Sequence, residues 1–354
     1  MSPSLLATPV DPLLPVPLAP LPETPLVSVL IGNFNYARFL PEAIESVLRQ
    51  SYSHWEICVC DDGSTDGSLD LIQGYAASDA RIRWVAQANA GHGAALNAAW
   101  SLADGPIVAL LDADDIWEPD KLARVVRAFR ERPTCGISTH RVRPFSESRT
   151  HPPIPERPDD GWVASKAIGT MRCSAPPTSG LAFRREICDQ IFPIPSEFRT
   201  LADGYLIKSA MFTTPIIGLG DCLARYRIHG SNVTGVSVDE STILRELDAT
   251  ARLFRAARGF LERSGRAAIA SQLSLANDLA YCEAALAVHL LTGKPISAEV
   301  VRSSHLRSST MRARLLRALA RLPRFLSRRL LLLWWGDGRL KEAGRALTRL
   351  RLRP

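Results

Sequence analysis

Four short apolar runs alternate with segments of helical periodicity between residues 26 and 131. The runs occupy residues 26–31, 55–60, 82–86 and 107–111, and Gly, Pro or polar residues bound each of them. Runs of this length predict buried strands, and apolar spacings of three and four residues between them predict helices. The alternation therefore predicts an α/β domain in which a mostly parallel sheet lies between two layers of helices.

The fourth run ends in three carboxylates, Asp112, Asp114 and Asp115. In an open α/β sheet, ligands bind beyond the carboxyl ends of the strands, where these side chains belong. Carboxylate oxygens suit Mg²⁺ or Mn²⁺, and a phosphate usually completes the shell. A solvated loop that caps the next helix is the alternative, because Pro119 suits a first helical turn. These residues alone leave both interpretations open.

The first two runs also end in polar loops, at residues 32–35 and 61–67. Neighbouring parallel strands bring such loops to the same sheet edge as the carboxylates. Asp62 could accept a bond from a base or ribose, Asn35 could bind polar groups, and Phe34 could stack on a base. Residues 61–67 taken alone suit a helix-capping turn. Three polar loops at one edge favour a ligand site.

Farther along the chain, the alternation of predicted strands and helices becomes less regular. Strands are predicted near residues 180–184 and 222–228, and a helix is predicted over 201–212. From about residue 239 the pattern is helical. Residues 1–25 are rich in proline, which predicts a disordered or extended tail. A chain of 354 residues can hold one large domain followed by this helical region.

The C-terminal segment, residues 302–354, is strongly basic, with 15 Lys or Arg and 2 Asp or Glu, whereas the rest of the chain carries a net charge of −6. Its arginines and leucines recur at helical spacing; they are Arg314, Arg317, Arg321, Arg324 and Arg328, with Leu315, Leu319, Leu322 and Phe325. A basic amphipathic helix suits an anionic membrane surface. The alternative is a helix that packs its leucines on the rest of the protein. Nucleic acid is not expected as a partner, because aromatic residues do not interleave with the arginines.

The seven cysteines are scattered and form no C-x-x-C pair, which favours a reducing compartment. No targeting segment is evident, and the apolar stretch 330–335 is too short to span a bilayer. These features predict a cytoplasmic protein that is peripheral on the inner face of a membrane.

Five stretches, VSVLIGNFN, EAIESVLRQS, WEICVCDDGSTDGS, NAGHGAALN and LLDADDIWEPDKL, follow one another between Val27 and Leu122. In order and spacing they resemble the nucleotide-binding half of family 2 glycosyltransferases, and a weaker likeness continues to Asn232. The resemblance implies a GT-A fold, Rossmann-like and three-layered. It divides the chain into a catalytic domain over 26–236, with a nucleotide-binding half at 26–122 and an acceptor-binding half at 123–236, and a C-terminal helical region over 237–354.

The resemblance also implies a role for each matching residue. Those that line the nucleotide base pocket are Gly32, Asn33, Phe34 and Asn35, and Asp62 contacts the base. The stretch from Asn89 to Asn97 matches the family's N-x-G-x-x-x-A-R-N segment near the donor. Asp112 and Asp114 match the D-x-D motif, with Asp112 directed toward ribose and metal and Asp114 on the metal.

Two more matches lie beyond the nucleotide-binding half. Asp203 matches the general base, for which the alternative is an acid favoured at a helix N-terminus. His229 lies in RIHGSN, which matches a late motif that closes on the diphosphate or metal. A lone histidine after a strand also satisfies local hydrogen bonds, so both interpretations of His229 stay open.

The chain departs from the family pattern at several positions. Gly32 stands where the family often has Pro or Thr, and Phe34 replaces the usual Tyr. Leu96 replaces the Arg of A-R-N; His92 could compensate, or be an ordinary surface histidine. The Q-x-x-R-W signature of processive membrane synthases is absent, which favours transfer of a single sugar.

The predicted function is inverting, Mg²⁺- or Mn²⁺-dependent transfer of a sugar from a nucleotide-diphosphate sugar to a hydroxyl of a glycan or lipid-linked acceptor, in cell-envelope or surface glycan synthesis. Asp203 would take the proton of that hydroxyl. One alternative is a nucleotidyltransferase that makes the sugar nucleotide. Another is a catalytically inactive scaffold that binds glycan or membrane.

Overall fold

A computed structural model describes residues 14–170, 172–230, 240–293, 295–296, 300, 311–323, 325–327 and 329–331. The chain divides into two compact units. Of the described residues, 14–167, 172–230 and 259–271 belong to the first unit, and the remainder belong to the second. The long helix α8 (Glu240–Arg263) contributes to both units.

The first unit is built on a sheet with the strand order β3-β2-β1-β4-β7-β6-β8-β5. The strands are β1 (Val27–Asn33), β2 (Trp55–Asp61), β3 (Ile82–Ala86), β4 (Ile107–Leu110), β5 (Ile116–Trp117), β6 (Ile137–Phe145), β7 (Leu181–Arg184) and β8 (Ile216–Arg227). Strands β1 to β4 are parallel, as their apolar runs predicted. Strand β7 is antiparallel to both β4 and β6, so the sheet as a whole is mixed.

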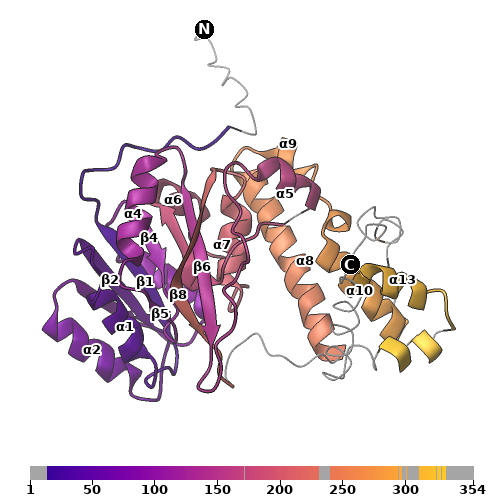
Figure 1. Ribbon diagram of the computed structural model, residues 1–354, viewed down its shortest axis with the longest axis horizontal. Coiled ribbons are helices and arrows are strands. Elements are labelled where there is room, and N and C mark those ends of the chain that lie inside the picture. The colour runs from indigo at the N-terminus through magenta and orange to yellow at the C-terminus, as the bar shows by residue number, and fades with distance from the viewer. Residues whose placement is uncertain are drawn as a thin grey trace, which may run out of the picture. The chain divides into compact units, whose positions relative to one another are not determined.

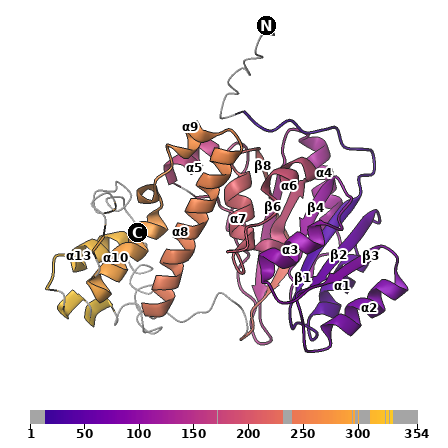
Figure 2. The same ribbon diagram turned by 180° about the vertical axis from the view of Figure 1, so that it is seen from behind.

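Helices cover both faces of the parallel part. Helices α1 (Leu40–Leu48), α2 (Ser68–Ser78) and α4 (Lys121–Glu131) pack on alternate residues of β1, which include Val27, Val29 and Ile31. Helix α3 (His92–Trp100) covers the other face, and Figures 1 and 2 show the two faces in turn. Because both faces are covered, β1 and β4 are apolar almost throughout.

The second half of this unit differs from the prediction in two places. Strand β8 begins at Ile216, six residues before the predicted start at Cys222. Helices α5 (Ala164–Thr170) and α6 (Arg185–Ile191) were not predicted, because each is only seven residues long and its periodicity is weak. Helix α7 (Ala202–Ala210) lies where a helix was expected.

Part of the proline-rich tail is bound to the first unit. Val16 N donates to Thr213 O at 2.7 Å, and Ala19 N donates to Glu186 Oε1 at 2.8 Å. Residues 14–25 therefore run extended along the unit rather than forming a disordered segment, whereas residues 1–13 lie outside the described part of the chain.

The second unit is helical, as predicted, with α10 (Leu279–Thr292) and α13 (Met311–Leu319) at its core. Asp278 caps α10 by accepting from Tyr281 N at 3.1 Å, and Gly293 ends the helix with a φ of 74°. Of the predicted apolar stripe, Leu315 and Leu319 pack into this core. Within the described ranges, no helix combines the length and the apolar character needed to cross a bilayer.

Candidate active site

The strand register brings the three polar loops to one edge of the sheet. Asn33, the last residue of β1, lies beside Asp61 at the end of β2. Leu30 of β1 pairs with Leu110 of β4, and Leu111 N donates to Leu30 O at 3.0 Å. Asp112 therefore follows β4 at about the level of Gly32. The edge predicted from the order of strands is formed as expected.

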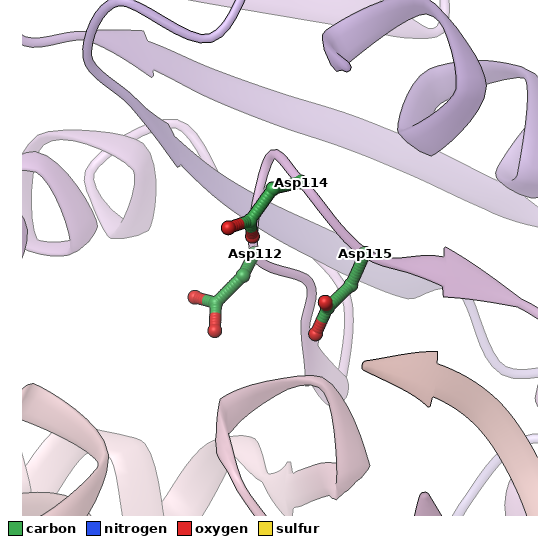
Figure 3. A group of neighbouring side chains, drawn as sticks. All are labelled: Asp112, Asp114 and Asp115. Carbon is green, nitrogen blue, oxygen red and sulfur yellow. The ribbon is translucent and has the colours of Figure 1, made fainter. Parts of the chain in front are cut away.

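The three carboxylates form the centre of the site. Single oxygen ligands of Asp112, Asp114 and Asp115 lie within 4.8 Å of one another, and Figure 3 shows all three side chains leaving the turn between β4 and β5. Asp114 and Asp115 are buried, and Asp112 is half-buried. Burial raises the pKa of Asp115 to about 8 and that of Asp112 well above its usual range, and the neighbouring carboxylates add to both shifts. Such a group favours a cation.

A late segment of the chain closes on these carboxylates. His229 Nε2 lies 2.9 Å from Asp114 Oδ2, and its ring lies 4.9 Å from the ring of Phe39. Arg227 donates its backbone N–H to Asp115 Oδ1 at 2.9 Å and its Nε–H to Asp114 O at 2.8 Å. Arg227 and His229 thus reach the acidic cluster, and His229 and Asp114 lie close enough to bind the same ion.

Tyr36 was not foreseen as part of the site, and the 178–180 turn was not foreseen as a contact of the carboxylates. Burial raises the pKa of Tyr36, and the charges of Asp114 and Asp112 add to that shift. The turn η1 (Thr178–Gly180) places the Ser179 hydroxyl on the backbone of Asp112, whose N–H donates to Ser179 Oγ at 3.0 Å. The position of Tyr36, directly after GNFN, was the only available signal for this residue. No local sequence pattern indicated that Ser179 would contact Asp112.

Asp203 reaches the same region through the segment that precedes α7. The backbone N–H groups of His92 and Gly93 donate to Arg199 O and Phe198 O, at 2.8 and 3.1 Å, which fixes that segment on the first turn of α3. The negative charge of Asp203 contributes to the pKa shifts of both Asp112 and His92, so its charge reaches the acidic cluster.

His92 is not an ordinary surface residue. Its Nε2 lies 3.4 Å from Asp112 Oδ1, and its side chain is only 28% exposed. Burial lowers the pKa of His92, and the charges of Asp203, Asp114 and Asp62 oppose that shift. A Cβ at Gly32 would lie 3.3 Å from His92 Cδ2, so the missing side chain at position 32 leaves room for the imidazole.

The carboxylate of Asp62 holds the loop before α3. It accepts from Gln87 Nε2 at 2.7 Å, Ala90 N at 2.9 Å and Gly91 N at 2.7 Å. A carboxylate offers about four acceptor positions, and the protein itself uses three of those of Asp62, which is 2% exposed. The side chain of Phe34 is 43% exposed at the same edge.

Two asparagines join the first two polar loops. Asn33 Nδ2 donates to Asp61 Oδ1 at 2.9 Å and to Ser64 Oγ at 3.1 Å. Asn35 has a φ of 58° and accepts from Thr65 N at 2.7 Å. These bonds fix the shape of the edge on which Phe34 lies.

Asn89 and Asn97 are engaged by the protein itself. Asn89 Nδ2 donates to Asp62 O at 3.1 Å, and its Oδ1 accepts from Arg199. Asn97 Nδ2 donates to Ile194 O at 2.8 Å, and Asn97 Oδ1 accepts from Ile194 N at 2.7 Å. Asn89 lies beside Asp62, whereas the structure does not bring Asn97 to the carboxylates. Donor contact by either residue stays a prediction.

A separate cavity of about 620 Å³ lies in the first unit. Its walls come from residues 14–17, the end of α6, Tyr205 of α7 and the end of α8. None of the predicted site residues lines it. The strand-edge site is therefore defined by its chemistry, not by cavity volume.

Comparisons with known proteins agree with this geometry. A family model described as glycosyl transferase family 2 matches residues 28–192. An uncharacterized glycosyltransferase of Nostoc, alr2836, is 42% identical over 214 residues, which cover 58% of this chain and 66% of the relative. The putative teichuronic acid biosynthesis glycosyltransferase TuaG of Bacillus subtilis is 32% identical over 218 residues, which cover 59% of this chain and 82% of that protein.

Solved structures support the same fold. The crystal structure of residues 1–349 of S. aureus TarS in complex with UDP-GlcNAc matches with a TM-score of 0.53 and 16% identity, over 87% of this chain and 91% of the other. The predicted GT-A architecture with a helical C-terminal region is confirmed. The family model, the relatives and this architecture together show that the chain is a glycosyltransferase and belongs to glycosyl transferase family 2.

Proposed function

We propose that the protein transfers a single sugar from a nucleotide-diphosphate sugar to an acceptor hydroxyl, with inversion at the anomeric carbon. One observation carries the proposal: Asp112, Asp114 and Asp115 gather at the strand edge, with His229 against Asp114 and with the charge of Asp203 acting on Asp112. Family membership decides against the alternative of a sugar-nucleotide nucleotidyltransferase.

The donor set of the cluster fits Mg²⁺ or Mn²⁺. It offers carboxylate oxygens and one imidazole, and the raised pKa values of Asp112 and Asp115 reflect burial and repulsion that a cation relieves. Asp114 and Asp112 would hold the ion, with His229 as a further ligand. Such an ion, when bound, neutralises charge on the leaving diphosphate.

The other side chains of the site have separate roles in binding the base and accepting the proton. Phe34 would stack on the base, and the hydrogen bonds of Asn33 and Asn35 hold the edge on which Phe34 lies. Asp62 would contact the base from the neighbouring loop. Asp203 would accept the proton as the acceptor oxygen attacks C1 from the face opposite the diphosphate. The C1–O bond to the diphosphate breaks as the new C1–O bond forms, and the leaving group departs with the electron pair.

The acceptor we propose is a cell-envelope or surface glycan, free or lipid-linked. The relatives support this class, because one is named for teichuronic acid biosynthesis, and a chondroitin synthase of Escherichia coli is 39% identical over 125 residues. TarS, with the same fold, is solved with UDP-GlcNAc, which supports a nucleotide-sugar donor.

A peripheral position on an anionic membrane, at the cytoplasmic face, is part of the proposal. In the described part of segment 302–354, four apolar side chains are at least 40% exposed, namely Leu322, Phe325, Leu326 and Leu330. Arg314, Arg321 and Arg329 are exposed in the same segment. Exposed apolar groups among arginines suit an anionic lipid surface.

A thermal-shift panel of nucleoside diphosphates and nucleotide sugars, with and without Mn²⁺, tests the proposed function. We expect one base to raise the melting temperature of the full chain only when Mn²⁺ is present, and Asp114→Asn to abolish that increase. The matched control Asp70→Asn removes an exposed carboxylate of α2 and should respond as the wild type does. No response to any nucleotide would favour an inactive scaffold.

A further inference from the structure

A completely buried lysine lies behind the carboxylates. Lys121, the first residue of α4, has 0% of its surface exposed. An amine removed from water is costly unless the protein supplies polar partners. Burial lowers the pKa of Lys121 well below its usual range, and the charge of Asp115 opposes that shift. The partners of this amine indicate what it does.

Those partners lie on the turn between residues 178 and 180. Lys121 Nζ donates to Ser179 O at 2.9 Å and lies 3.2 Å from the ring centroid of Trp117. Trp117 Nε1 donates to the same carbonyl at 3.1 Å. Two buried donors, one from β5 and one from α4, therefore fix a single carbonyl of a turn that is 62 and 58 residues away from them in sequence.

The same turn holds two carboxylates of the site. Asp112 N donates to Ser179 Oγ at 3.0 Å. The nearby hydroxyls of Thr178 and Ser179 oppose the rise in the pKa of Asp112 and of Asp115, respectively, and Asp115 is 0% exposed. A displacement of Ser179 would thus move the backbone of Asp112 and change the polar surroundings of both carboxylates.

His140 does not serve as a second cation in this pocket. It is 1% exposed, and its Nδ1 lies 2.9 Å from Arg141 O. Burial lowers its pKa to about 3, and the nearby Lys121 contributes to that shift. At neutral pH the imidazole is uncharged, so Lys121 is the basic group that faces Asp115 from α4.

We propose that Lys121 is a positioning residue: it fixes the Thr178–Gly180 turn, and this turn holds Asp112 and Asp115 in the arrangement that receives a divalent cation. The role in cation binding rests on the proposed function. The role in fixing the turn does not, and it can be measured on the metal-free protein.

The test compares the full-length wild type with Lys121→Met, which keeps the length and apolar stem of the side chain but removes the amine. The matched control is Arg184→Met. Arg184 is also a buried cation, at 1% exposed, but it pairs with Glu186 and lies beside Ile107, at the opposite end of β4 from Asp112. Both variants should lower the melting temperature.

The deciding readout is hydrogen exchange of metal-free protein, measured on peptides that cover residues 107–117 and 176–184. We expect Lys121→Met to accelerate exchange in both peptides by about 10-fold or more, while β1 and β2 stay as in wild type. In Arg184→Met, the backbone amide of Asp112 in the 107–117 peptide should exchange as slowly as in the wild type. Equal exchange at Asp112 in Lys121→Met and wild type would overturn the inference, whether or not the protein binds metal.

Titration with Mn²⁺ alone gives the second readout. Loss of a residue that orients metal ligands costs about 10–100-fold in affinity, which we expect for Lys121→Met but not for Arg184→Met. In a double-mutant cycle, Ser179→Ala should add little to Lys121→Met, because both act through one turn. Additive effects would contradict the proposal. If Lys121→Met does not fold, Trp117→Phe removes the other donor to Ser179 O and should accelerate the same peptides.

Discussion

His229 Nε2 lies 2.9 Å from Asp114 Oδ2, although the two residues are 115 positions apart in the sequence. We expect His229→Ala to weaken Mn²⁺ binding by about 10–100-fold, because Asp114 loses the group that orients it and the ion loses a ligand. Titration with Mn²⁺ measures the change. His54→Ala is the control, since His54 is exposed and contacts Thr24 O. Unchanged affinity in His229→Ala would favour a local hydrogen bond as its only role.

Asp203→Asn should lower kcat by about 100-fold or more while leaving the donor dissociation constant nearly unchanged. The amide cannot accept the acceptor proton, yet it retains the size of the side chain. Sugar transfer and donor binding are measured on the same preparation. Asp189→Asn removes an exposed carboxylate of α6 and should retain wild-type turnover. Near-normal turnover in Asp203→Asn would exclude this residue as the base.

The stability of the metal-free protein should depend on pH through Asp115. Its pKa is about 8 in the folded protein, against about 3.9 in an unfolded chain. Between these values the folded state binds more protons, so this group makes the free energy of unfolding fall as the pH rises from about 4 to about 8. Asp115→Asn should flatten that slope in denaturant titrations at several pH values, and Asp70→Asn should not. An equal slope in all three proteins would contradict the assignment.

Gly32→Ala should disturb the site. The added Cβ would lie 3.1 Å from Ala95 Cβ and 3.3 Å from His92 Cδ2, so the imidazole beside Asp112 must shift. We expect weaker donor binding and a loss of about 1–3 kcal/mol in the free energy of unfolding. Gly74→Ala is the matched control, because a Cβ at Gly74 of α2 meets nothing within 4 Å. It should stabilise the protein by about 0.5–1 kcal/mol without affecting donor binding.

The paired substitution Phe325→Ser and Leu326→Ser should reduce co-sedimentation with anionic vesicles by about 10-fold or more, because it removes two apolar side chains that are 67% and 40% exposed. Ile154→Ser, at a similarly exposed position outside this segment, is the control. Vesicles without anionic lipid should bind both proteins weakly. If the paired variant binds as the wild type does, the exposed leucines and phenylalanine serve another contact.

The C-terminal stripe illustrates how local pattern and packing differ. Its spacing predicted one apolar face, with either membrane or protein as the partner. The structure divides it: Leu315 and Leu319 pack on the core of the second unit, whereas Leu322 and Phe325 are exposed. Periodicity indicates that a face is apolar but not what covers it. Arg324 and Arg328 lie outside the described residues.

The sequence by itself determined the four parallel strands, the helices between them, and the sheet edge that carries Asp62, Asp112 and Asp114. These features are local, because a buried strand requires an apolar run, and a turn at its end requires polar or glycine residues. The order of such elements then limits the topology. Helix α6 and the early start of β8 were not predicted, because short segments carry little periodic signal.

Only the tertiary structure decided which distant side chains meet at that edge. The contact of His229 with Asp114, the Ser179 hydroxyl on the backbone of Asp112, and the burial of Lys121 all join segments separated by long stretches of chain. The physical reason is that hydrogen bonds and buried charges depend on three-dimensional distance and local polarity, and these emerge only when the sheet and its helices pack.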